Sequence, residues 1–229
     1  TALDMANLNR VFPGNPAGTV TEMLAHVLLD GVLAGCDAIV DLHAEPDTMA
    51  IRCLYTPPPS DEHGRRSFAL AQASGNPILY LTEGVPGMLT TVARARGIPA
   101  VMPETGGPLP GAAGLMPEAQ GEVLNILRAL GSIPGEPEPA AHVTVDRVAH
   151  IRAPVGGLYR PAVGFDRVGQ MVPGGETLGA IVSVFTGETL AEIEAPFAES
   201  WLMMVRGRVS RVHPGDPLYI VGRETGRAS

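Results

Sequence analysis

Helical and strand patterns alternate between residues 19 and 130, and this alternation restricts the possible folds more than any other feature of the sequence. Thr19 and Glu22 have the spacing of a capping box, and apolar residues then recur at helical intervals up to Gly35. Further helices are expected at residues 65–74, 86–96 and 117–130, and strands at residues 38–42, 77–81 and 99–102. Helices and strands in this order predict a layered α/β domain.

The composition changes at residues 131–141, where proline and glycine are frequent, as in a linker. Short alternating strands are expected beyond it, at residues 142–151, 157–161, 177–184, 192–195, 200–205 and 218–222. We therefore predict two domains, an α/β domain at residues 1–135 and a C-terminal all-β domain at residues 142–229. Residues 193–197 resemble half of a biotinyl- or lipoyl-type barrel motif, so the β domain is expected to be barrel-sandwich-like.

Charge and composition exclude several classes of function. The net charge of −8 disfavours general binding to nucleic acid or to an anionic membrane. The sequence contains no lysine, which excludes a Schiff base, a Walker lysine and a biotin or lipoate carrier. No apolar stretch of membrane-spanning length and no leader pattern occur, so a cytoplasmic protein is expected, with homo-oligomers permitted.

Two polar residues follow expected strands. His43 ends the apolar stretch at residues 38–42, at the carboxyl edge where open α/β sheets build their sites. Glu104 follows residues 99–102 and precedes Gly106 and Gly107, where the backbone can approach closely. Imidazole is a zinc ligand, and a fixed carboxylate suits a general base. The alternatives are a hydrogen-bonded loop histidine and a turn or helix-capping acid.

Asn9 and Arg10 lie in a proline- and glycine-rich loop near the start of the chain. An arginine in a rigid loop can bind a carboxylate through two parallel hydrogen bonds, and the asparagine can add a third. The alternative is a surface arginine paired with Asp4.

Taken together, these motifs resemble the succinylglutamate desuccinylase/aspartoacylase family of zinc deacylases. The resemblance covers nearly the whole chain, in order and in spacing, and rests on residues 7–14, 41–43, 103–107, 152–159 and 193–196. It implies a carboxypeptidase-like α/β fold, with helices on both faces of a mixed sheet, followed by a C-terminal β domain. It also implies one zinc ion per chain and a small N-acyl amino acid as substrate.

The resemblance assigns a role to each candidate residue. His43 would be the third zinc ligand and Glu104 the general acid/base, while Asn9 and Arg10 would bind the substrate carboxylate. Arg94 would be a second anion contact or would polarise the scissile carbonyl. The implied activity is hydrolysis of an amide bond by metal-activated water, which releases an acetyl, succinyl or similar acyl group from an amino acid derivative.

The family's first two zinc ligands come from a His-Gly-Asp/Asn-Glu motif, and no such motif precedes Asn9 here. Two explanations follow. Either a natural N-terminal part precedes Thr1, which is the explanation we favour because the other motifs persist in order, or the protein is a catalytically inactive, zinc-free relative that binds carboxylates.

Overall fold

The computed structural model describes residues 1–45, 48–107 and 115–228 of the 229-residue chain. These residues form two compact units, and the chain passes between the units several times. Unit 1 contains residues 1–41, 55–71 and 81–102, whereas unit 2 contains residues 42–54, 72–80 and 103–229. The division of the chain at residues 135–142 stays a prediction.

Unit 1 contains a short parallel strand pair and helices. The strand β1 (Ile39–Val40) pairs in parallel with the first residues of β4 (Ala100–Gly106). The expected capping box is confirmed: the Thr19 side chain accepts a hydrogen bond from the Glu22 backbone, and the Glu22 carboxylate accepts one from the Thr19 backbone. The helices are η1 (Leu8–Arg10), α1 (Val20–His26), η2 (Val27–Val32), most of α2 (Glu62–Ser74) and α3 (Leu89–Ala95).

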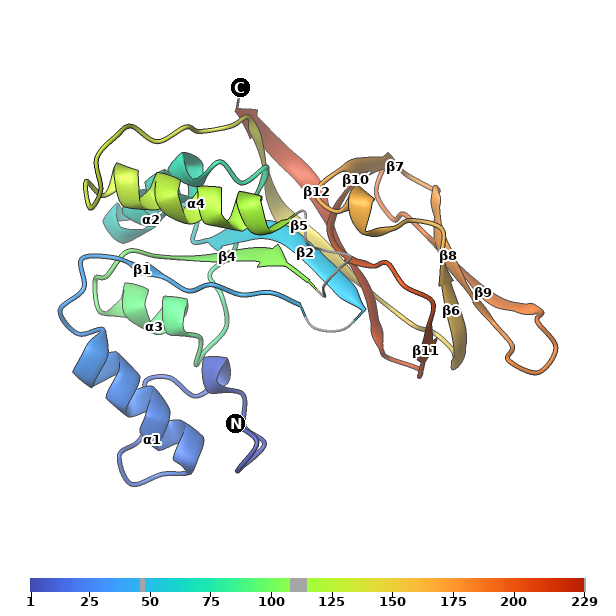
Figure 1. Cartoon of the computed structure of the whole chain (residues 1–229), viewed down its shortest axis with the longest axis horizontal. Helices are drawn as coiled ribbons and strands as arrows, with labels where there is room; N and C mark the ends of the chain where they lie inside the picture. Colours follow the sequence, from blue (N-terminus) through green and yellow to red (C-terminus); the bar gives the residue numbers. More distant parts are fainter. Residues whose placement is uncertain (46–47, 108–114, 229) are drawn as a thin grey trace. The chain divides into compact units, whose positions relative to one another are not determined.

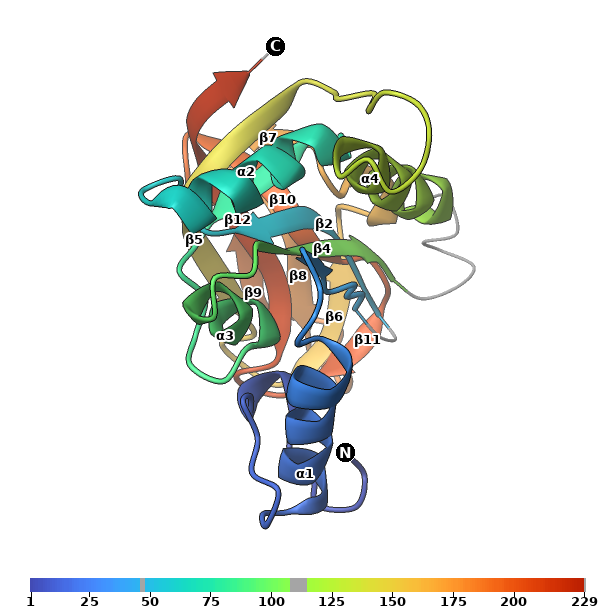
Figure 2. The same cartoon turned by 90° about the vertical axis from the view of Figure 1, so that its left-hand side faces the viewer.

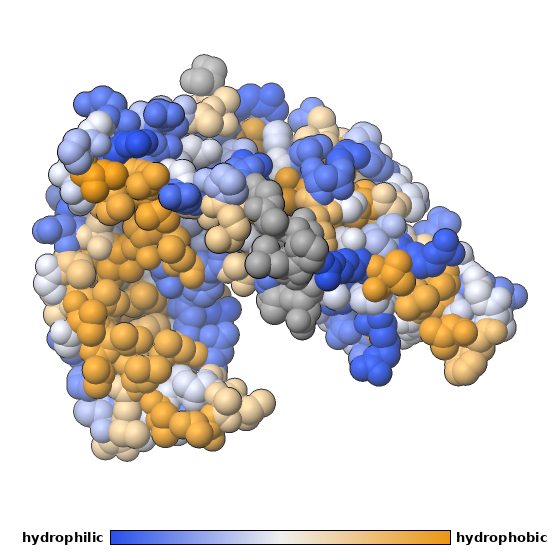
Figure 3. Space-filling view, viewed as in Figure 1, coloured by the Kyte–Doolittle hydropathy of each residue, from blue (hydrophilic) through white to orange (hydrophobic). Residues whose placement is uncertain are grey.

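The helix α1 continues directly into η2, and the two form one continuous helical segment (Figure 2). Its buried residues are Thr21, Ala25 and Leu29. The two apolar ones, Ala25 and Leu29, pack with Phe12, Ile39, Leu89 and Ala93 in the core of unit 1. Met23 and Val27 belong to the apolar residues that recur at helical intervals, but both are exposed, and hydrophobic side chains gather over α1 (Figure 3). Periodicity alone could not choose between these faces, because α1 carries apolar residues on both.

Unit 2 is built on long antiparallel strands. The strand β12 (Pro217–Ala228) lies between β5 (His142–Arg152) and β10 (Glu199–Arg206), as Figure 1 shows. On the other side of β10 lies β7 (Met171–Pro173). The strand β5 also pairs in parallel with β3 (Ile78–Leu81), so the strands that follow the expected linker continue a sheet begun before it. With parallel and antiparallel pairs present, the expected mixed α/β architecture is confirmed.

A second sheet in unit 2 has the strand order β11-β6-β8-β9. Its strands are β6 (Gly157–Pro161), β8 (Thr177–Val182), β9 (Thr189–Glu194) and β11 (Ser210–Val212). Between residues 142 and 228 the chain forms strands and one short helix, η4 (Phe165–Arg167). A buried apolar core that includes Tyr159, Leu178 and Tyr219 belongs to this part of the chain. The barrel-sandwich form of the region stays a prediction.

The strand β2 (Met49–Thr56) is the main element that the sequence analysis missed. It reads Met-Ala-Ile-Arg-Cys-Leu-Tyr-Thr, and its first residues pair antiparallel with β10. Unit 2 also contains α4 (Met116–Ala129), close to its expected position. None of the helices in the described ranges is both long and apolar enough to cross a membrane.

Candidate active site

Parallel pairing brings His43 and Glu104 together in unit 2. The two residues form a β-bridge: the His43 N–H donates to the Pro103 carbonyl at 3.0 Å, and the Thr105 N–H donates to the His43 carbonyl at 3.3 Å. The His43 Nδ1 atom lies 3.8 Å from the Glu104 Oε1 atom. The Glu104 side chain is only 12% exposed, whereas that of His43 is 32% exposed, so the imidazole is the more accessible member of the pair.

Two glycines allow the end of β4 to lie close to its neighbours, as the sequence led us to expect. Gly106 has a φ of +154°, and a Cβ atom placed there would lie 2.9 Å from the Ala44 Cβ atom. A Cβ atom at Gly107 would lie 2.7 Å from the Met49 carbonyl oxygen. Because a side chain at either position would push these segments apart, the two glycines help to set the position of Glu104.

A cavity of about 690 Å³ opens beside His43. Its lining is mainly apolar and includes Leu42, Pro103, Val123 and Leu124. This volume is in the range of small-molecule sites in proteins. The helix α4 supplies one wall through Val123 and Leu124, while the face it buries is formed by Glu122, Asn125 and Ile126. Leu130, which directly follows α4, is exposed.

Asn9 is buried in unit 1, where its side chain links three segments. Its Oδ1 atom accepts a hydrogen bond from the Leu89 N–H at 2.7 Å, at the start of α3. Its Nδ2 group donates to the Asp41 Oδ2 atom at 3.3 Å, just after β1. Both polar atoms of the Asn9 amide therefore have protein partners, and the role of Asn9 in binding a substrate carboxylate stays a prediction.

We expect Asn9→Ala to lower the free energy of unfolding by about 1–3 kcal/mol, because the Leu89 N–H would lose its buried acceptor. Urea unfolding of the purified chain measures this loss. Asn7→Ala is the matched control: Asn7 also accepts a backbone hydrogen bond, from Asn9, but its side chain is exposed, so a smaller loss is expected. Unchanged stability of Asn9→Ala together with a raised KM would instead favour direct contact with substrate.

Arg10 is exposed and donates a hydrogen bond from Nη1 to the Asn9 carbonyl at 2.5 Å. Asp4, the alternative partner, accepts hydrogen bonds from Thr1, Ala6 and Thr21 instead. Within the described ranges no ion pair joins Arg10 to Asp4. These contacts leave the predicted role of Arg10 as an anion contact open to test.

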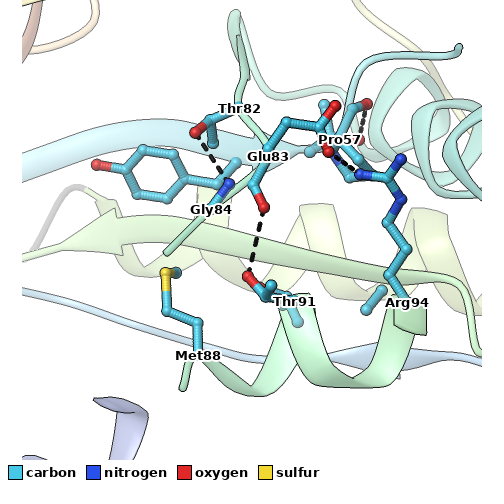
Figure 4. A pocket seen from close by; sticks show the side chains of 11 residues that line it. Pro57, Thr82, Glu83, Gly84, Met88, Thr91 and Arg94 are labelled. Atoms are coloured by element: carbon cyan, nitrogen blue, oxygen red, sulfur yellow. Dashed lines mark hydrogen bonds and ion pairs between the residues drawn. The ribbon is translucent and has the colours of Figure 1, made fainter. Parts of the chain in front are cut away.

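Arg94 lies on α3, and its guanidinium points toward Glu83 (Figure 4). Its Nη2 group binds the Asp61 carboxylate at 2.8 Å, and its Nη1 group donates to Glu83. These carboxylates raise the pKa of Arg94. The neighbouring cavity has a volume of about 20 Å³, roughly enough for one water molecule. The predicted contact between Arg94 and a substrate anion is not tested by this arrangement and stays a prediction.

The described residues do not by themselves complete a zinc site. A structural or catalytic zinc ion needs three or more protein ligands, and no group of three or more histidine, cysteine or acidic side chains with suitable geometry occurs in the described part of the chain. His43 offers one imidazole, and Glu45 is the next carboxylate along the chain. Burial raises the pKa of the Glu45 carboxyl, and His43 lowers it by a smaller amount.

A buried polar cluster next to Glu104 escaped the sequence analysis. It consists of Asn76, Thr105 and Glu122, which are each less than one-tenth exposed. Burial raises the pKa of Glu122 to about 7, although hydrogen bonds from Asn76 and Thr105 oppose the rise. A signal was present in the sequence: Glu122, Asn125 and Ile126 share one face of a helix by their spacing. A face with two polar residues would ordinarily be assigned to solvent.

Residues 2–130 match the family model described as "Succinylglutamate desuccinylase/Aspartoacylase catalytic domain". The chain is 25% identical over 228 residues to the N-alpha-acetyl-L-2,4-diaminobutyric acid deacetylase of Halomonas elongata, covering 96% of this chain and 66% of that protein. The chain thus spans just under two thirds of the length of this curated relative.

Two solved structures are similar along nearly the whole chain. The succinylglutamate desuccinylase/aspartoacylase from Rhodobacter sphaeroides has a TM-score of 0.83 and 27% identity, covering 99% of this chain and 70% of that one. The product-bound ectoine utilization protein EutE (DoeB) from Ruegeria pomeroyi has a TM-score of 0.83 and 26% identity, covering 97% of this chain and 69% of that one.

Proposed function

Because the chain belongs to the succinylglutamate desuccinylase/aspartoacylase family, we propose that it removes an acyl group from an N-acyl amino acid or a related small amide. The observation that carries the proposal is the parallel bridge that sets the Glu104 carboxylate beside the His43 imidazole. The relative from Halomonas elongata, named as an N-acetyl diaminobutyrate deacetylase, supports this class of substrate.

In the proposed reaction Glu104 is the general base and acid. Its carboxylate takes a proton from the attacking water and returns it to the nitrogen of the leaving amine, so that a carboxylic acid and a free amino group form. Glu104 is mostly buried and held at the end of a paired strand, which keeps the carboxylate in one place.

The zinc ion is part of the proposal, with His43 as one ligand. When bound, zinc would polarise the scissile carbonyl and lower the pKa of a bound water. Since the described residues supply one imidazole and no complete ligand group, the other ligands are not assigned. The substrate carboxylate is proposed to be held by Asn9, Arg10 and Arg94. A cytoplasmic location is a separate part of the proposal.

The direct test is to incubate the purified full-length protein with N-acetyl and N-succinyl amino acids and to measure the free amine released. Metal content is measured in parallel after dialysis, with His43→Ala as the control. About one zinc per chain that is lost in His43→Ala, together with amine release, would support the proposal. Carboxylate binding with neither zinc nor amine release would favour the zinc-free binding protein instead.

We expect Arg10→Gln to raise KM by about 10-fold or more for a substrate with a free carboxylate, because a charge-assisted pair would be lost. Arg94→Gln is the matched comparison. A smaller rise is expected there, because Asp61 and Glu83 already bind the Arg94 guanidinium. Steady-state kinetics with the substrate acid and with its amide test this expectation. An equal rise in KM for both would contradict carboxylate recognition by Arg10.

A further inference from the structure

The side chain of Glu122 is tied to the strand that carries Glu104. The Thr105 hydroxyl lies 3.0 Å and 3.1 Å from the two Glu122 carboxyl oxygens. The Asn76 Nδ2 group donates to the Glu122 Oε1 atom at 2.9 Å and lies 3.2 Å from the Thr105 hydroxyl. All three side chains are buried, so these bonds form away from competing water.

Thr105 follows Glu104 directly on β4, and successive side chains of a strand point to opposite faces. A bond that fixes the Thr105 side chain therefore fixes the rotation of the strand about its axis at Glu104. The Thr105 N–H is also bonded to the His43 carbonyl, so the same residue holds the bridge between the two site residues.

The helix and the strand that hold Glu122 and Asn76 are themselves fixed by further hydrogen bonds. Asn125, one turn beyond Glu122 on α4, donates through Nδ2 to the Ser74 and Glu138 carbonyls. It also accepts a hydrogen bond from the Glu138 N–H. The Asn76 Oδ1 atom accepts a hydrogen bond from the Ile78 N–H at the start of β3. Glu122 thus connects Thr105 to a helix and a strand that are each held by separate bonds.

We propose that Glu122 is a positioning residue for Glu104, acting through Thr105 to hold the end of β4 in the geometry that proton transfer needs. This inference rests on the proposed role of Glu104 as the general base. Glu122 itself lies on the opposite face of the strand and does not touch the reacting atoms. A small displacement of a catalytic group can cost as much as 100-fold in rate, which sets the scale of the expected effect.

The kinetic test removes the hydrogen bond between Glu122 and Thr105 by substituting either residue. Glu122→Leu and Thr105→Val should both lower kcat by about 10-fold to 100-fold, with KM changed by less than about 3-fold. Glu122→Gln should keep kcat within about 3-fold of the unsubstituted chain, because an amide can accept from Asn76 and donate to Thr105. If Glu122→Leu fails to fold, Thr105→Val still tests the proposal, because it removes one hydroxyl at nearly constant volume.

Asn125→Ala is the matched control for a purely structural effect. It removes buried hydrogen bonds from the same helix but none from Thr105, so it should lower stability while kcat stays within about 3-fold. A loss of kcat in Asn125→Ala as large as in Glu122→Leu would overturn the positioning role.

Amide hydrogen exchange followed by NMR gives a readout that needs no activity. In Glu122→Leu and Thr105→Val the amides of His43 and Thr105 should exchange at least about 10-fold faster, relative to amides of the β5–β12 pair. In Asn125→Ala this ratio should not change. Unchanged exchange at Thr105 in the first two variants would contradict the proposal that Glu122 holds the end of β4 through Thr105, whatever the kinetics show.

The two measurements separate the two proposals. An unsubstituted chain without amine release contradicts the proposed hydrolysis, and the exchange rates then decide alone whether Glu122 anchors Thr105. An active chain in which exchange becomes faster but kcat stays unchanged would leave the hydrolysis standing and would overturn the positioning role of Glu122.

Discussion

Glu104→Gln should lower kcat for amide hydrolysis by about 100-fold to 10,000-fold, with little change in KM. The glutamine has the size of the glutamate and can keep the strand pairing, but it cannot accept a proton from water or return one to the leaving amine. Initial rates at saturating substrate measure the effect. Because the substitution removes a transition-state role, kcat and kcat/KM should fall together.

Glu45→Gln is the matched control for this experiment. Glu45 is also a partly buried carboxylate of unit 2 and lies two residues from His43 in the chain. It lacks the strand bridge that holds Glu104 beside the imidazole, so a change in kcat of less than about 10-fold is expected. A larger fall in Glu45→Gln than in Glu104→Gln would assign the base to Glu45 and would contradict the proposed mechanism.

The free energy of unfolding should fall as the pH rises from about 4.5 to about 7, and Glu122 should account for up to about 3 kcal/mol of the change. Burial raises the pKa of Glu122 in the folded chain to about 7, whereas the unfolded carboxyl titrates near 4.5. Between these values the folded state holds a proton that the unfolded state releases, so the stabilisation is complete below pH 4.5 and lost above pH 7.

The charged and polar groups around Glu122 modify this shift without reversing it. Asn76, Thr105 and the Arg52 guanidinium lower the pKa of Glu122, and the neighbouring Glu118 carboxylate raises it. Burial is the largest of these influences and acts against the charged form.

Glu122→Gln is the variant that isolates this contribution. Urea unfolding of both proteins between pH 4 and pH 8 should show similar stability at the acid end, with the glutamine variant the more stable at pH 8. Subtracting the two curves removes the titration of every other group. A difference that does not depend on pH would contradict a buried carboxyl that is protonated below neutral pH.

The order and type of most elements could be predicted from the sequence, because local patterns encode them directly. The capping box at Thr19, the helix ending near Ser74 and the strand at residues 157–161 all occur where they were expected. The strand β2 was missed because an apolar stretch with an arginine inside it has no clear period, and β12 is longer than its apolar pattern.

The sequence indicated the family and placed His43 and Glu104 each at the end of an expected strand, whereas their pairing was found only in the structure. Both residues end apolar stretches, and the ends of parallel strands meet at one edge of a sheet. Only the tertiary structure decided which partners hold these residues. The Asn9 amide bonds to Leu89 and Asp41, which lie far away in the chain.

Glu122 shows most clearly that the sequence did not reveal hydrogen-bond partners. Its spacing puts it on one helix face with Asn125 and Ile126, but only the packing of α4 places it against Thr105 and Asn76. Local patterns report the conformation of a segment, whereas burial and hydrogen-bond partners depend on contacts between residues that the sequence separates widely.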